Sequence, residues 1–164
     1  MTITVFINTW GRYNQGLQGA WVDLGEQDNE DLEEFLKSKV RDTDPEYFIQ
    51  DTNTSVEGIE EQTDFFFLNE TLYDLGDDID EEYFVAVAEV DGFQTALNEI
   101  TSQYPFDKYS FFEADNNENL GLAIVEEGLF GDIPSHLESY IDYEAIGRDW
   151  SASFASNGLA VCSN

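Results

Sequence analysis

The chain has 164 residues with 36 acidic and 6 basic side chains, so its formal net charge is −30. No Lys or Arg occurs between residues 42 and 107, where nineteen acids accumulate, or between 109 and 147, where nine more occur. Self-repulsion of this size destabilises a compact state. It also argues against binding to nucleic acid or to an anionic membrane surface. The composition therefore predicts a strongly basic protein partner.

The apolar content predicts a folded chain. Leu, Ile, Val and Phe make up 45 residues, about 27 %, whereas highly charged chains stay unfolded below roughly 20 %. The first residues have no signal-peptide pattern, and no apolar stretch approaches the ~20 residues of a membrane helix. Cys162 is the single cysteine, which is typical of a small apolar residue in a reducing compartment. We therefore expect a cytoplasmic protein.

The first 60 residues have the pattern of a small α+β domain. Strands are predicted at 3–7, 20–24 and 47–51, from alternating apolar residues and a glycine-rich loop after the first strand. Residues 28–41 have the spacing of an amphipathic helix, capped by Asp28 or Asn29. Acids occupy its first turn and bases its last, which suits the helix dipole.

The segment 61–105 has a helical pattern. We expect one helix capped by Asn69, a second capped by Asp80, and a third over 93–104 that Pro105 ends.

The segment 106–164 is again α+β in pattern. Its predicted elements are a strand at 109–114, helices at 116–128 and from Pro134 to Ile141, and strands at 153–155 and 159–161. The fold class is therefore α+β, as an elongated chain of three small domains at 1–60, 61–105 and 106–164.

No enzyme motif or cofactor motif is present. His136 is the only histidine, and G-x-S-x-G, H-E-x-x-H and glycine-rich phosphate loops are absent, so we expect no catalytic residue, no metal site and no cofactor. Residues 115–126 approach a calcium loop, with Asp115, Asn117, Asn119 and Glu126 at ligand positions. However, Leu120 stands where the turn requires glycine, so a capped helix is the favoured interpretation.

The amount of charge matches a length of DNA. Duplex DNA carries one negative charge per ~1.7 Å, so 30 charges correspond to roughly 15 base pairs. Carboxylates fixed along a folded scaffold would present a field like that of DNA to a protein with a basic groove. Salt adaptation is the other explanation for so many acids, but 15 % aromatic residues argue against it.

Two stretches resemble the ArdA antirestriction family. They are TWGRYNQGLQGAWVDL (residues 9–24) and LFGDIPSHLESYIDYEAIGRDW (residues 129–150), and the second carries a D-I-P triplet followed by Y-x-D-Y-E-A-x-x-R-D. The resemblance implies a non-enzymatic, homodimeric, curved rod-like mimic of bent duplex DNA. Its implied target is the DNA-binding groove of a Type I restriction-modification enzyme. The alternative is an acidic inhibitor or adaptor of another basic nucleic-acid-handling protein, such as a CRISPR effector or a nucleoid protein.

Two groups of residues follow from this resemblance. The expected phosphate surrogates are Glu70, Asp74, Asp77, Asp78, Asp80, Glu81, Glu82, Glu89, Asp91, Glu99, Asp107, Asp115, Glu118, Glu126 and Glu127. For each one, a merely solvated face is the alternative. The expected antirestriction motif and dimer contact contains Leu129, Ile133, Pro134, Leu137, Tyr140, Ile141 and Tyr143, for which a core role within one domain is the alternative. Arg148 is expected to pair with an acid.

Overall fold

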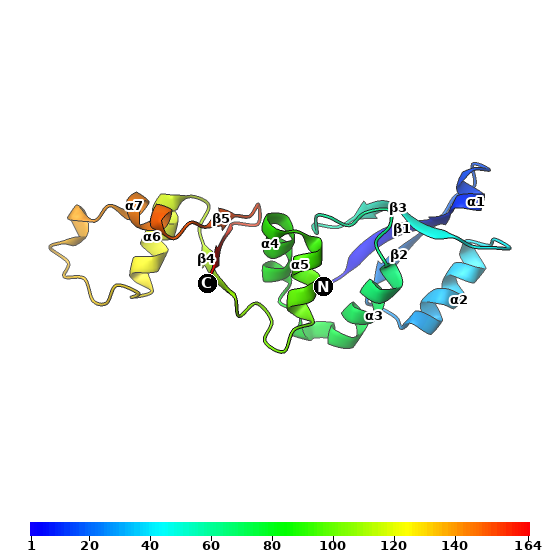
Figure 1. Cartoon of the computed structure of the whole chain (residues 1–164), viewed down its shortest axis with the longest axis horizontal. Helices are drawn as coiled ribbons and strands as arrows, with labels where there is room; N and C mark the ends of the chain where they lie inside the picture. The colour runs from blue at the N-terminus through cyan, green and yellow to red at the C-terminus, as the bar shows by residue number, and fades with distance from the viewer. The chain divides into compact units, whose positions relative to one another are not determined.

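The computed structural model describes all 164 residues and confirms a mixed α+β fold. It contains seven α-helices, two short 3-10 helices and six strands, and the strands form two three-stranded antiparallel sheets. The chain divides into two compact units, residues 1–81 and 82–164, which are described separately (Figure 1). None of the helices combines the length and the apolar character that a membrane span requires.

The first sheet confirms the three strands predicted in this region. It consists of β1 (Ile3–Thr9), β2 (Ala20–Leu24) and β3 (Tyr47–Asn53), in the order β2-β1-β3. Ile3, Val5 and Ile7 of the central strand are fully buried, because alternate side chains of a strand point to the same face. The short helix α1 (Trp10–Tyr13) follows β1 directly.

The helix α2 (Asn29–Lys39) is also confirmed, and Asp28 is its cap. The Asp28 carboxylate accepts a hydrogen bond from the backbone N–H of Asp31 at 2.9 Å. Leu32 and Leu36 are fully buried one turn apart, as the apolar spacing predicts. Figure 1 shows α2 and α3 (Phe65–Leu75) along one side of this sheet.

The prediction that Asn69 caps a helix is wrong. α3 begins at Phe65 and its cap is Asp64, so Asn69 lies inside the helix, where it is fully buried. Its Oδ1 accepts from the N–H of Gly25, and its Nδ2 donates to the carbonyl of Gln27 and to Oδ1 of Asn29, each at 2.9 Å. The amide therefore serves a tertiary contact with the turn between β2 and α2.

The second unit begins with two helices. α4 (Glu81–Asp91) starts directly after Asp80, as predicted, and α5 (Phe93–Ile100) follows. Phe84 and Phe93 meet edge to face, with ring centroids 6.2 Å apart. α5 ends before the predicted stop at Pro105. The Thr101 hydroxyl hydrogen-bonds back to the carbonyls of Leu97 and Asn98, a local contact that competes with helix continuation.

The second sheet contains β4 (Tyr109–Glu113), β6 (Leu159–Ser163) and β5 (Ser153–Phe154), in the order β4-β6-β5. These strands confirm the predictions for the C-terminal region. α6 (Asn117–Glu126) and α7 (Tyr143–Asp149) complete a core that contains Phe112, Leu120, Ile124 and Cys162. Burial raises the pKa of the Cys162 thiol, which keeps it protonated and unreactive.

The predicted helix from Pro134 to Ile141 is wrong. Only a single 3-10 turn forms there, η2 (Glu138–Tyr140), and the preceding residues are irregular. Gly128 and Gly131 both have positive φ, and Pro134 follows closely. Nearly all side chains of the segment are exposed, so no core face stabilises a helix that is too short to persist alone.

Candidate functional site

Both units carry a large excess of negative charge. Residues 1–81 contain 21 acids and 4 bases, and residues 82–164 contain 15 acids and 2 bases. Only two carboxylates pair with a lysine, Glu33 with Lys37 and Glu99 with Lys108, each at 2.7 Å. Glu81 lies 3.7 Å from the N-terminal amine. Almost the entire acidic complement is therefore left without a lysine partner in the chain.

The densest run of predicted surrogates lies on α3 and on the turn that follows it. α3 buries Phe65, Leu68 and Leu72, which leaves Glu70 and Asp74 exposed on its outer side. These two acids are four residues apart, so they are neighbours on the helix and repel each other. Asp77 and Asp78 form the 3-10 turn η1 (Gly76–Asp78), and Asp80, Glu81 and Glu82 follow at the start of α4, all of them exposed.

Two acids of the second unit are held by hydrogen bonds. The Glu89 carboxylate accepts from the backbone N–H of Ser156 and, at 2.7 Å, from its hydroxyl, which fastens the β5–β6 turn to α4. Asp91 accepts from the Tyr109 hydroxyl at 2.8 Å. Burial and this hydrogen bond raise the pKa of Tyr109. These carboxylates therefore stabilise the fold whatever else they bind.

Glu99 is buried, so its prediction as a phosphate surrogate on the surface is wrong. It is only 4 % exposed, because α5 turns this position inward, and one of its oxygens accepts from Lys108 Nζ. The hydrogen bond that Lys108 donates to Glu99 raises the pKa of Lys108. The sequence gives no sign of this burial, because an acid on an amphipathic helix is ordinarily solvated.

The remaining predicted surrogates are exposed: Asp107, Asp115, Glu118, Glu126 and Glu127. Asp115 precedes α6 and accepts from the side-chain amides of Asn116 and Asn119, each at 2.7 Å. Asn116 caps α6, which confirms the capped helix in place of a calcium loop. Glu126 and Glu127 lie at the C-terminal end of the same helix.

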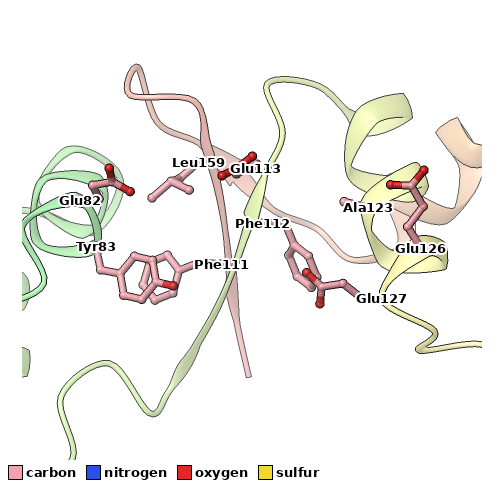
Figure 2. Close-up of a pocket in the computed structure, with 9 residues that line it drawn as sticks. All are labelled: Glu82, Tyr83, Phe111, Phe112, Glu113, Ala123, Glu126, Glu127 and Leu159. Carbon is pink, nitrogen blue, oxygen red and sulfur yellow. The ribbon is translucent and has the colours of Figure 1, made fainter.

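A hollow of about 400 Å³ lies among α4, β4 and α6 (Figure 2). The ring of Tyr83 stacks on that of Phe111, with centroids 3.9 Å apart and planes within 3°. Figure 2 shows Phe112 directed to the opposite side of β4, toward α6. The other lining residues are Glu82, Glu113, Ala123, Glu126, Glu127 and Leu159. Sequence reasoning missed this aromatic pair, because its two members are 28 positions apart and on different elements.

The predicted antirestriction motif is an exposed apolar segment. Leu129, Leu137 and Tyr140 are 53 %, 45 % and 83 % exposed, and Pro134 is exposed too. Ile133, Ile141 and Tyr143 are partly buried. Phe130, which sequence reasoning left out, is 58 % exposed although it follows Leu129 directly. The alternative of a core within one unit therefore does not describe most of this segment.

Two glycines allow α7, the helix that follows this segment, to pack closely against α6. A Cβ added at Gly121 of α6 would overlap the carbonyl oxygen of Tyr143, and one at Gly147 of α7 would overlap that of Asn117. α6 and α7 therefore approach each other at backbone distance. Arg148 extends from α7 into solvent and takes part in none of the three ion pairs, so its predicted pairing is wrong.

Comparison with known proteins supports one family. The model of the antirestriction protein (ArdA) family matches residues 5–160, nearly the whole chain. A search of curated proteins finds no match. The chain therefore belongs to the ArdA family, whose members are non-enzymatic antirestriction proteins that mimic DNA and act against Type I restriction-modification enzymes.

Proposed function

We propose that the exposed carboxylates of residues 70–82, 107–118 and 126–127 are the phosphate surrogates through which this chain occupies the DNA-binding groove of its target. One observation carries this proposal. Of 36 acids, two form an ion pair with a lysine, and every acid of these three ranges is exposed. Acids that served only solubility would not need such a number, since a net charge of about 2–8 keeps a small domain soluble.

Such binding is expected to depend on salt as DNA binding does, with the acidic protein in the place of the DNA. Cations condensed around the acidic surface are released when a basic groove replaces them, so affinity falls steeply as salt rises. Complementary fields also accelerate the encounter between the two proteins. The energy is spread over many weakly interacting charges, so no single carboxylate dominates it.

The first test compares single with grouped substitutions. Single changes at Glu70, Asp74, Asp77 or Asp78 to the matching amide are expected to alter inhibition of a purified Type I enzyme less than about twofold. The four together are expected to weaken it at least tenfold, with a shallower dependence on salt. The readouts are DNA cleavage and displacement of labelled duplex from the enzyme.

Two results would contradict this proposal. If one Asp→Asn change abolished activity, a localised active site would be indicated. If the wild-type chain neither displaced DNA nor lowered the activity of any Type I enzyme tested, another basic partner would become the better candidate.

We also propose that two copies associate through the exposed apolar segment, residues 129–143. Leu129, Phe130, Leu137 and Tyr140 are at least 45 % exposed and lie within twelve residues. Clustered exposed apolar side chains mark interaction sites, and a two-fold dimer buries the same patch from both subunits. A Leu137→Asp, Tyr140→Asp double variant is expected to halve the mass measured by light scattering, without loss of helix signal. An unchanged mass would remove this segment from the interface.

The curved rod-like shape of the dimer stays a prediction from the resemblance, and the division into domains at 1–60, 61–105 and 106–164 stays a prediction from the sequence pattern. A cytoplasmic location also stays a prediction from the sequence, and it agrees with a single buried cysteine that needs no oxidising compartment.

A further inference from the structure

The hollow beside β4 combines an acidic rim with an aromatic wall. Its rim carries four exposed carboxylates, those of Glu82, Glu113, Glu126 and Glu127, and none of them takes part in an ion pair. Its wall is aromatic and apolar. The volume of about 400 Å³ lies within the range of small-ligand sites.

The aromatic wall is fixed in place by its neighbours. Tyr83 and Phe111 are stacked and partly buried, and Phe106 meets both rings edge-on, at centroid distances of 6.1 and 6.0 Å. Phe106 itself is 6 % exposed. The wall is therefore preorganised, so a flat ligand loses little free energy in ordering it.

β4, which lines the hollow, is also an edge strand of its sheet. It pairs with β6 on one side only, so the other side of the strand has no neighbouring strand. Backbone carbonyl groups at such an edge are free to accept hydrogen bonds. Phe111, Phe112 and Glu113 of this edge strand line the hollow, and the carboxylates there offer acceptors to a ligand with several donors.

The two rim acids at the C-terminal end of α6 are expected to destabilise that helix. Glu126 and Glu127 lie at its negative end, and its last turn contains no basic residue. Carboxylates there destabilise a helix, because the unpaired carbonyls already carry partial negative charge. Removing these charges should therefore not unfold the protein.

We propose that this hollow receives an arginine side chain of the target protein. The inference rests on the proposed function, and it names the chemical group that docks here. A metal ion is a poor fit, because no three acidic, histidine or cysteine side chains of the chain converge closely enough to hold one. A guanidinium is flat, carries five donors in a fixed fork and stacks on aromatic rings, whereas a lysine ammonium is a compact, strongly hydrated charge. Its methylene stem lies against Leu159 and the rings, and its donors reach the rim.

The first experiment uses a probe and needs no target enzyme. N-acetyl-arginine amide is titrated into the ¹⁵N-labelled chain at low salt, with the citrulline analogue as the neutral control of the same shape. Saturable shifts are expected at Tyr83, Phe111 and Ala123, and none with citrulline. The variant Glu113→Gln, Glu126→Gln, Glu127→Gln is expected to bind the probe at least fivefold more weakly, with an unchanged or higher melting temperature. Shifts spread evenly over the acidic residues, or an unaltered affinity in the variant, would overturn the proposal.

The second experiment separates the hollow from general charge. The same triple variant is compared with Glu70→Gln, Asp74→Asn, Asp77→Asn, which removes three exposed surrogates of the first unit that take part in no ion pair. Inhibition of a Type I enzyme is expected to weaken at least threefold more for the rim variant than for the control. Equal losses would overturn the arginine site and leave DNA mimicry standing. If the wild-type chain does not inhibit, the proposed function fails, and the probe titration still decides the site.

Discussion

The buried amide of Asn69 gives the sharpest prediction about stability. Asn69→Ala removes three hydrogen bonds of 2.9 Å that join α3 to the turn between β2 and α2. Each contributes a net ~0.5–1.5 kcal/mol, and the N–H of Gly25 and the carbonyl of Gln27 lose a buried partner. Alanine recovers up to ~0.7 kcal/mol through its better helix propensity. The expected net loss is therefore about 2–3 kcal/mol.

The assay is urea unfolding followed by circular dichroism, with Asn98→Ala as the matched control. Asn98 is exposed on α5 and makes only a solvent-facing side-chain contact with Gln94, so its loss should stay within about 0.5 kcal/mol. Asn69→Asp is a second variant. It keeps the acceptor for Gly25, but it loses both donors and buries a charge, so it should cost more than alanine. A cost below about 1 kcal/mol for Asn69→Ala would refute the reasoning that this amide joins the two elements.

Two further predictions concern the second unit. The pKa of Tyr109 is raised, so the folded state holds its proton while the unfolded chain ionises from the ordinary value of 10.0. This contribution to stability is complete below that pH and is lost as the pH rises above it. Tyr109→Phe is therefore expected to show a smaller fall in melting temperature between about pH 9 and pH 11, and an identical fall would contradict the assignment. Gly121→Ala is expected to destabilise by about 1–3 kcal/mol, because the added methyl overlaps the carbonyl oxygen of Tyr143 and separates α6 from α7. An unchanged melting temperature would contradict this prediction, because it would show that α6 and α7 can move apart without a loss of stability.

The elements with strong local signals could be predicted from the sequence. The alternation at Ile3, Val5 and Ile7 and the apolar spacing at Leu32 and Leu36 match the buried faces of β1 and α2. Predictions of single residues failed where one residue type can serve two structural roles. Asn69 is a good cap and also a good buried hydrogen-bonding group, and only the packing of α3 on the first sheet decides between them.

Charge and family motifs likewise indicate the class of function from the amino-acid sequence alone. The base-free stretches predict an outward negative field, and residues 9–24 and 129–150 carry the family resemblance that the match over 5–160 confirms. Charge and motifs depend only on residue type and on spacing along the chain, so they can be determined from the sequence without the tertiary structure.

Tertiary structure alone decided which residues are available to a partner. Glu99 is buried against Lys108, Glu89 holds Ser156, and the apolar segment around Leu137 and Tyr140 is exposed. The stack of Tyr83 on Phe111 exists only because α4 and β4 meet. Burial and proximity depend on contacts between residues far apart in the chain, and neither hydropathy nor charge at a single position reports them.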